Sequence, residues 1–209
     1  TSHAQIASSS LIHKKLPLFV ETADVIGDAQ VRNMGTIGGS IAHADPSADW
    51  PAALLAANAS IVVRSGTKTK TFSAAKFFTG FFSTALGEGE IITEIQIPSP
   101  AKGVKMTYQK FMQPASRFAI VGCAAMVKIE DGIVTDANIA FTGVSDAPFR
   151  DAGVEKAIKG KAATTENIAN AAAKAASGIN INADHYADEE YRQHLATVYA
   201  KKALTAVCG

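Results

Sequence analysis

The residues with the clearest chemical potential lie at positions 35–40, where Gly35, Gly38 and Gly39 alternate with the hydroxyl residues Thr36 and Ser40. Glycine lets a backbone bend tightly and approach a ligand closely, and successive backbone N–H groups in such a turn can bind a phosphate. The two hydroxyls can add hydrogen bonds without adding charge. On spacing alone, a glycine-rich connection that only turns a corner explains the pattern equally well.

A helix is expected shortly after this glycine turn. Asp49 is a favourable N-cap residue, Pro51 suits the first helical turn, and the run Ala52–Ala57 is a strong helix former. The pair Asp45-Pro46 is interpreted as a turn. The glycine turn is therefore predicted to lie just before a helix, where N–H donors gather.

These same residues carry a resemblance to a known family. Residues 32–39, read with Ala44-Asp45-Pro46 and Asp49, resemble the second flavin-binding motif of the FAD subunits of molybdenum hydroxylases, the family that includes the medium subunits of aerobic carbon monoxide dehydrogenase and bacterial xanthine dehydrogenase. Lys110-Phe111 and residues 114–121 are similar to the segment that opens the C-terminal domain of those subunits. The resemblance covers essentially the whole chain.

The resemblance implies an α+β fold, namely the second half of a PCMH-type FAD-binding domain followed by a CO dehydrogenase flavoprotein C-terminal-like domain, built from a small antiparallel sheet plus helices. It further implies that the turn binds the pyrophosphate of FAD through a set of neighbouring residues. That set is Thr36, Ile37, Gly38, Gly39 and Ser40.

Three further residues are implicated by the same resemblance. Asp49 is expected to accept hydrogen bonds from the polar chain of the flavin, besides capping its helix. Lys110 is expected near the pyrimidine edge of the flavin, where its charge would stabilise the reduced, anionic form, although an ordinary surface lysine fits the sequence as well. Ile92 is expected to pack near the ring, or to be only a core residue.

Family members begin with a small subdomain that carries a first glycine motif of the Ala-Gly-Gly-Thr type and shares the FAD pyrophosphate with the second motif. The present sequence opens at Thr1–Ile6, which resembles the point where that subdomain has just ended. We therefore expect half of the cofactor cradle to lie outside these residues, and FAD binding by this chain alone to be weak or absent.

The implied function is that of a FAD-binding electron-transfer subunit, an oxidoreductase component that passes electrons between iron–sulfur clusters and an external acceptor such as NAD or oxygen. Substrate oxidation would take place on another subunit. The expected partners are a molybdopterin-binding large subunit and an iron–sulfur small subunit, or a chain that supplies the missing first FAD motif. A flavin-free interaction module that docks to partner subunits is the alternative.

Composition excludes several other classes. The 20 basic and 19 acidic residues create no field that would attract nucleic acid or an anionic membrane. Two distant cysteines, Cys123 and Cys208, are too few to ligate an iron–sulfur cluster and fit a reducing cytosol, so we expect a soluble, cytoplasmic protein. No nucleophile motif or metal-ligand pattern is present, and the five histidines are interpreted as structural or exposed. They are His3, His13, His43, His185 and His194.

Two domains are expected, with residues 1–98 as the second FAD subdomain, 99–103 as a linker rich in proline and glycine, and 104–209 as the C-terminal α+β domain.

In the first domain, periodicity predicts a helix from Leu16 to Ile26 that ends at Gly27. Strands are predicted at 61–64, 68–72 and 91–97, while 73–84 is ambiguous between a short helix and irregular packing. In the second, strands are predicted at 104–111, 119–130 and 133–141, the last two joined by a turn at Asp131-Gly132, and helices at 151–159, 165–176 and 189–207.

Overall fold

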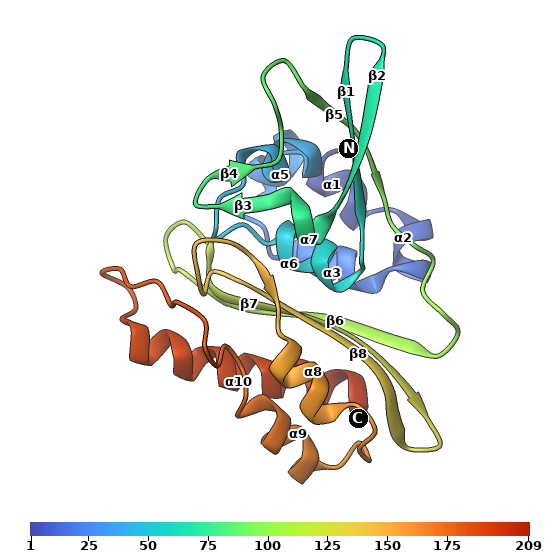
Figure 1. Cartoon of the computed structure of the whole chain (residues 1–209), viewed down its shortest axis with the longest axis vertical. Coiled ribbons are helices and arrows are strands. Elements are labelled where there is room, and N and C mark those ends of the chain that lie inside the picture. Colours follow the sequence, from blue (N-terminus) through green and yellow to red (C-terminus); the bar gives the residue numbers. More distant parts are fainter.

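A four-stranded antiparallel sheet separates the two halves of the molecule (Figure 1). The computed structural model describes all residues, 1–209. The sheet has the order β6-β7-β8-β9, with the N-terminal helices and a smaller sheet on one face and three C-terminal helices on the other. Its strands are β6 (Val104–Met112), β7 (Ala119–Glu130), β8 (Ile133–Thr142) and β9 (Phe149–Arg150).

The hairpin between β7 and β8 confirms the predicted turn. Asp131 and Gly132 both have positive φ angles, 50° and 77°, as a two-residue turn of this kind requires, and Glu130 pairs with Ile133 on either side. The short strand β9 was not predicted, because two residues carry no usable periodicity.

The central strands are apolar on both faces. Side chains alternate between faces along a strand, so Ala124 and Met126 of β7 belong to the core on the N-terminal side, while Cys123 and Ala125 belong to the core on the C-terminal side. A strand buried on both faces loses the polar and apolar alternation of an ordinary surface strand. The long apolar run at 119–127 reflects this double burial.

Three capped helices cover the C-terminal face of the sheet. They are α8 (Ala152–Ile158), α9 (Thr165–Ala172) and α10 (Glu189–Cys208), with Asp151, Thr164 and Asp188 as their N-caps. All three were predicted, but α9 ends at Ala172 rather than at residue 176, and the chain continues as turns.

Six short helices form most of the N-terminal half. They are α1 (His3–Ala7), α2 (Ser10–Lys15), α3 (Pro17–Asp24), α4 (Ala29–Met34), α5 (Ile37–His43) and α6 (Trp50–Ala56). The helix predicted from Leu16 to Ile26 is present as α3 with slightly narrower bounds, because Leu16 has φ −141° and ψ 57° and the helix begins at Pro17. The helices α1, α2 and α4 were not predicted.

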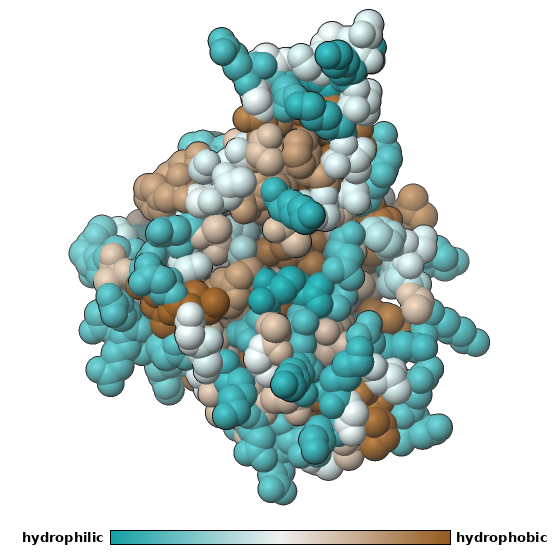
Figure 2. Space-filling model, in the orientation of Figure 1, coloured by the Kyte–Doolittle hydropathy of each residue, from teal (hydrophilic) through white to brown (hydrophobic).

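A small sheet and an aromatic segment complete this half. The three predicted strands are present as β1 (Ser60–Ser65), β2 (Lys68–Ser73) and β5 (Ile91–Gln96), and they pair in the order β2-β1-β5. The ambiguous segment contains a one-turn helix, α7 (Ala74–Phe77), and two short strands that were not predicted, β3 (Phe78–Gly80) and β4 (Ser83–Thr84). In the orientation of Figure 2 the projecting β1–β2 hairpin is largely hydrophilic, and smaller apolar areas lie among polar residues below it.

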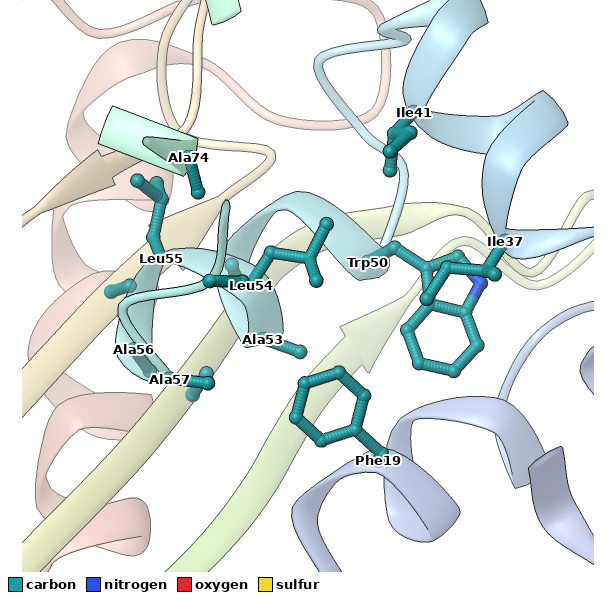
Figure 3. Packing of buried hydrophobic residues seen from close by; sticks show 14 of the residues in the cluster. Phe19, Ile37, Ile41, Trp50, Ala53, Leu54, Leu55, Ala56, Ala57 and Ala74 are labelled. Atoms are coloured by element: carbon teal, nitrogen blue, oxygen red, sulfur yellow. The ribbon is translucent and has the colours of Figure 1, made fainter. Parts of the chain in front are cut away.

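The N-terminal core is shared between the two expected domains. Trp50 and Phe19 are fully buried and stacked, with ring centroids 5.9 Å apart, and Leu54 lies beside them (Figure 3). The same cluster contains Tyr108, Ala124, Met126 and Ala140 from the central sheet. Residues on both sides of the segment 99–103 therefore share one core. The division of the chain into two domains at this segment stays a prediction.

Candidate functional site

The glycine motif forms the first turn of α5 rather than a turn that precedes a helix. Thr36 is the N-cap, and its Oγ1 accepts a hydrogen bond of 2.9 Å from the N–H of Gly39. Gly38 and Gly39 are thus helical residues. The helix predicted after the turn is present as α6, but α5 itself was not predicted, because glycine disfavours helix interiors, whereas here the capping threonine decides where the helix begins.

Only some backbone donors of this turn remain free. The N–H of Ile37 donates to the carbonyl of Thr1 at 3.1 Å, and the N–H of Ser40 donates to the carbonyl of Thr36 at 3.0 Å. The N–H groups of Thr36 and Gly38 donate to no acceptor in the chain. Four successive donors were expected between 36 and 39, and two of them are available to a ligand.

The glycines of the motif serve different purposes. A Cβ atom at Gly35 would lie 2.7 Å from Nε2 of His3 and 3.0 Å from the carbonyl oxygen of Val31, so Gly35 makes room for protein atoms. A Cβ atom at Gly38 would have no protein atom within 4 Å. The space above Gly38, beside its free N–H, is therefore open to a ligand.

Two cavities flank the N-terminus of α5. The first, about 540 Å³, is lined by Ile37 and Gly38 together with Ile92 and its neighbours on β5. The second, about 440 Å³, is lined by Thr36, Gly39, Ser40, Asp49 and several exposed apolar residues. The structure thus brings Ile92 to the same cavity as Ile37 and Gly38, and it divides the motif between two adjoining spaces.

Asp49 occupies the N-cap position of α6, but its side chain does not cap that helix. Its Oδ1 accepts a hydrogen bond of 2.6 Å from the hydroxyl of Tyr108, and its Oδ2 lies 2.8 Å from Nζ of Lys110. The expected capping role of this carboxylate is wrong, because two partners on β6 hold it instead.

The side chain of Lys110 is buried, and the alternative of an ordinary surface lysine is wrong. Its side chain is 2% exposed, and Nζ donates to the carbonyl of Val25 at 3.1 Å as well as to Asp49. Lys110 lines neither cavity. It is connected to the second cavity only by its ion pair with Asp49, which does line that cavity. An ammonium group has three N–H donors, and the chain uses two of them.

Burial shifts the pKa values of Asp49 and Tyr108. Burial raises the pKa of Asp49, while the ammonium of Lys110 and the hydroxyl of Tyr108 act in the opposite direction. The pKa of Tyr108 is raised well above its usual range by burial and by the neighbouring charge of Asp49. Tyr108 therefore keeps its proton and donates to the carboxylate.

Some site residues were missed at the sequence level. Tyr108 lies two positions before Lys110 on one strand, and the two-residue period of a strand places both on one face, so a signal was present. His3 is buried and its Nδ1 accepts from Nε1 of Trp50 at 3.0 Å, which fits the structural interpretation of the histidines. No group of histidine, cysteine, aspartate or glutamate side chains in the chain could hold a metal ion.

Two protein-family models match the chain almost end to end. Residues 1–100 match the FAD binding domain in molybdopterin dehydrogenase, and residues 106–207 match the CO dehydrogenase flavoprotein C-terminal domain. The glyceraldehyde dehydrogenase medium chain of Sulfolobus acidocaldarius is 37% identical over 207 residues, 99% of this chain and 73% of that protein. The chain belongs to the family of FAD-binding medium subunits of molybdenum hydroxylases.

Other members of this medium-subunit family agree in sequence and in fold. The carbon monoxide dehydrogenase medium chain of Hydrogenophaga pseudoflava is 35% identical over 99% of this chain and 72% of its own length. A solved structure of carbon monoxide dehydrogenase from that organism superposes with a TM-score of 0.95 at 36% identity, over 99% of this chain and 72% of the other. These relatives are oxidoreductase subunits, and the predicted α+β fold is confirmed. None of the helices is both long and apolar enough to cross a bilayer.

Proposed function

We propose that this chain binds FAD at the N-terminus of α5 and passes electrons between iron–sulfur clusters and an external acceptor within a molybdenum hydroxylase complex. Membership of the medium-subunit family supports an oxidoreductase role with FAD as cofactor. The observation that carries the assignment to this place is Gly38, which combines an unpaired N–H with open space above its Cα.

The residues around α5 suit the chemistry of a dinucleotide. The free N–H groups of Thr36 and Gly38, with the hydroxyl of Ser40, offer donors to phosphate oxygens at a helix N-terminus. Ile37 and Ile92 form an apolar wall of the first cavity. An elongated ligand that crosses the helix N-terminus would reach both cavities.

FAD, when bound, supplies a centre that accepts and releases electrons singly or in pairs. The protein's part is to hold it and to set the charge around it. Asp49 offers acceptor capacity to hydroxyl or N–H groups in the second cavity, since each carboxylate oxygen can accept more than one hydrogen bond. Lys110 balances the charge of Asp49 and adds a positive field from 2.8 Å behind it.

We propose as partners the molybdopterin-binding and iron–sulfur subunits, or a chain that supplies a first FAD motif. The names of the relatives describe them as medium chains or medium subunits. In this chain, Met34, Val31 and Phe118 line the second cavity although they are 83%, 48% and 44% exposed. Exposed apolar residues gathered at one site are typical of a surface that another molecule covers.

Titration of the 209-residue chain with FAD tests the function. Two free N–H donors are few for two phosphates, so we expect weak binding by these residues alone and tight binding once a polypeptide with the first motif is added. Quenching of flavin fluorescence gives both affinities. Failure to bind FAD under either condition would favour the flavin-free docking module instead.

A further inference from the structure

The hydroxyl of Tyr108 makes one hydrogen bond, and that bond goes to Asp49. Tyr108 lies on β6 and is 5% exposed, and its Oη donates to Oδ1 of Asp49 at 2.6 Å. A hydroxyl that donates to a buried carboxylate at this distance forms a short, charge-assisted bond. The bond fixes one oxygen of Asp49, while Lys110 fixes the other at 2.8 Å.

A glycine on the adjacent strand makes room for this hydroxyl. Gly122 lies within β7, near its start, and pairs with Lys110; its φ is not positive, so its backbone does not require glycine. A Cβ atom at Gly122 would overlap Oη of Tyr108 and would lie 2.8 Å from Cγ2 of Thr142. Glycine weakens a strand interior, and here the space it leaves is filled by the tyrosine hydroxyl.

The backbone of Tyr108 is held as well. Its N–H donates to Oε2 of Glu21 at 2.7 Å, and the same oxygen accepts from the hydroxyl of Thr107 at 2.8 Å. Glu21 belongs to α3, whereas Asp49 precedes α6. Tyr108 is thus attached at its backbone and at its hydroxyl to two different helices, which leaves Oη little freedom to move.

We propose that Tyr108 is a positioning residue for the flavin site, which orients the carboxylate of Asp49 toward the second cavity, and that Gly122 is required because it leaves space for the tyrosine hydroxyl. This inference rests on the proposed function, since it assumes that FAD contacts Asp49. Without the hydroxyl, Oδ1 is free to rotate toward the N–H groups that begin α6, the ordinary partners of an aspartate at that position.

The test compares FAD affinity and flavin spectra of the full protein, purified with the polypeptide that completes its cofactor site. Tyr108→Phe removes one oxygen and keeps the ring. We expect FAD to bind about tenfold more weakly, with a shifted visible flavin spectrum, because one charge-assisted bond no longer orients Asp49. Gly122→Ala should change affinity in the same direction by displacing the hydroxyl. Tyr186→Phe is the matched control, because Tyr186 is 49% exposed and its hydroxyl has no partner.

A double-mutant cycle separates positioning from a loss of packing. If Tyr108 acts through Asp49, then Tyr108→Phe should weaken FAD binding less than about twofold in an Asp49→Ala background, where the hydroxyl has no side-chain oxygen to orient. Equal losses in both backgrounds, or a wild-type dissociation constant and spectrum for Tyr108→Phe, would overturn the proposal. If the unmodified protein binds no FAD, the proposed function itself is wrong, and this inference is wrong with it. Should Gly122→Ala fail to fold, the cycle with Tyr108→Phe decides alone.

Discussion

Nζ of Lys110 and Oδ2 of Asp49 lie 2.8 Å apart, with 2% and 5% of their side chains exposed. The pair joins β6 of the second half of the chain to the start of α6 in the first half. Removing charges from water is costly, so a buried pair contributes little net stability, but breaking it leaves one charge without compensation.

We therefore expect Lys110→Met to lower the free energy of unfolding by about 3–5 kcal/mol. The double variant Asp49→Asn, Lys110→Met should regain much of this loss, because no uncompensated charge remains and the amide still accepts from Tyr108. Urea unfolding measures both. The exposed pair Lys159–Asp136 serves as the control, and Lys159→Met should change stability by less than about 1 kcal/mol. Equal effects at the two sites would show that the buried charge of Asp49 is compensated by other groups.

A second prediction concerns Gly38. The Gly38→Val side chain would enter open space, so the variant should unfold cooperatively with little loss of stability, but it should bind FAD at least about tenfold more weakly because the side chain blocks the N–H. Flavin absorbance after purification and fluorescence titration measure retention. Ala42→Val, on the exposed part of the same helix, is the control for helix propensity. Unchanged flavin content in Gly38→Val would place the cofactor elsewhere.

A third prediction concerns the segment from Pro98 to Gly103. It contains no strand or helix, and Lys102 within it is exposed, so limited trypsin digestion should cut there first. The two fragments should nevertheless elute together on gel filtration, because Tyr108 and Met126 belong to the core of the first half. First cleavage between 119 and 141 would contradict the expected domain division.

A fourth prediction concerns acidification. The pKa of His3 is lowered by burial, and its Nδ1 must be unprotonated to accept from Trp50. The unfolded chain takes up a proton on this histidine near pH 6.5, whereas the folded chain resists it, so this contribution to stability is complete above pH 6.5 and is lost as the pH falls toward the lowered value. Urea unfolding at pH 7.5 and 5.5 measures the loss. His3→Asn retains an acceptor but does not titrate, so its stability should depend less on pH across this range.

The C-terminal half was predictable because its signals are local. The turn at Asp131-Gly132 dictates a hairpin, and the capping residues Asp151, Thr164 and Asp188 mark helix starts that their own side chains confirm. The shortest helices of the N-terminal half were harder to predict, because α1 and α4 have 5 and 6 residues, span fewer than two turns and show little periodicity. They are stable because of the core beneath them rather than because of their propensities.

The site was predictable in its residue types and less so in its contacts. Glycine and threonine at positions 36–39 indicate that the backbone can approach a ligand closely. The N–H of Ile37, however, donates to the carbonyl of Thr1 and is not available to a ligand, and this bond depends on a pairing between segments distant in sequence. The burial of Lys110 likewise depends on α3 and α6 covering β6. No local pattern shows that a lysine on a strand will meet an aspartate 61 positions away.

The shared sheet has a consequence for synthesis of the protein. Ala124, Met126 and Ala140 complete the core that Trp50 and Phe19 begin, yet the ribosome adds them after residue 100. At about 5–20 residues per second, roughly two to eight seconds pass between residue 100 and residue 140. During that interval the N-terminal helices have only the small β2-β1-β5 sheet and lack the central one, and we expect the nascent chain to present Trp50 and Phe19 to chaperones until the β7–β8 hairpin has emerged.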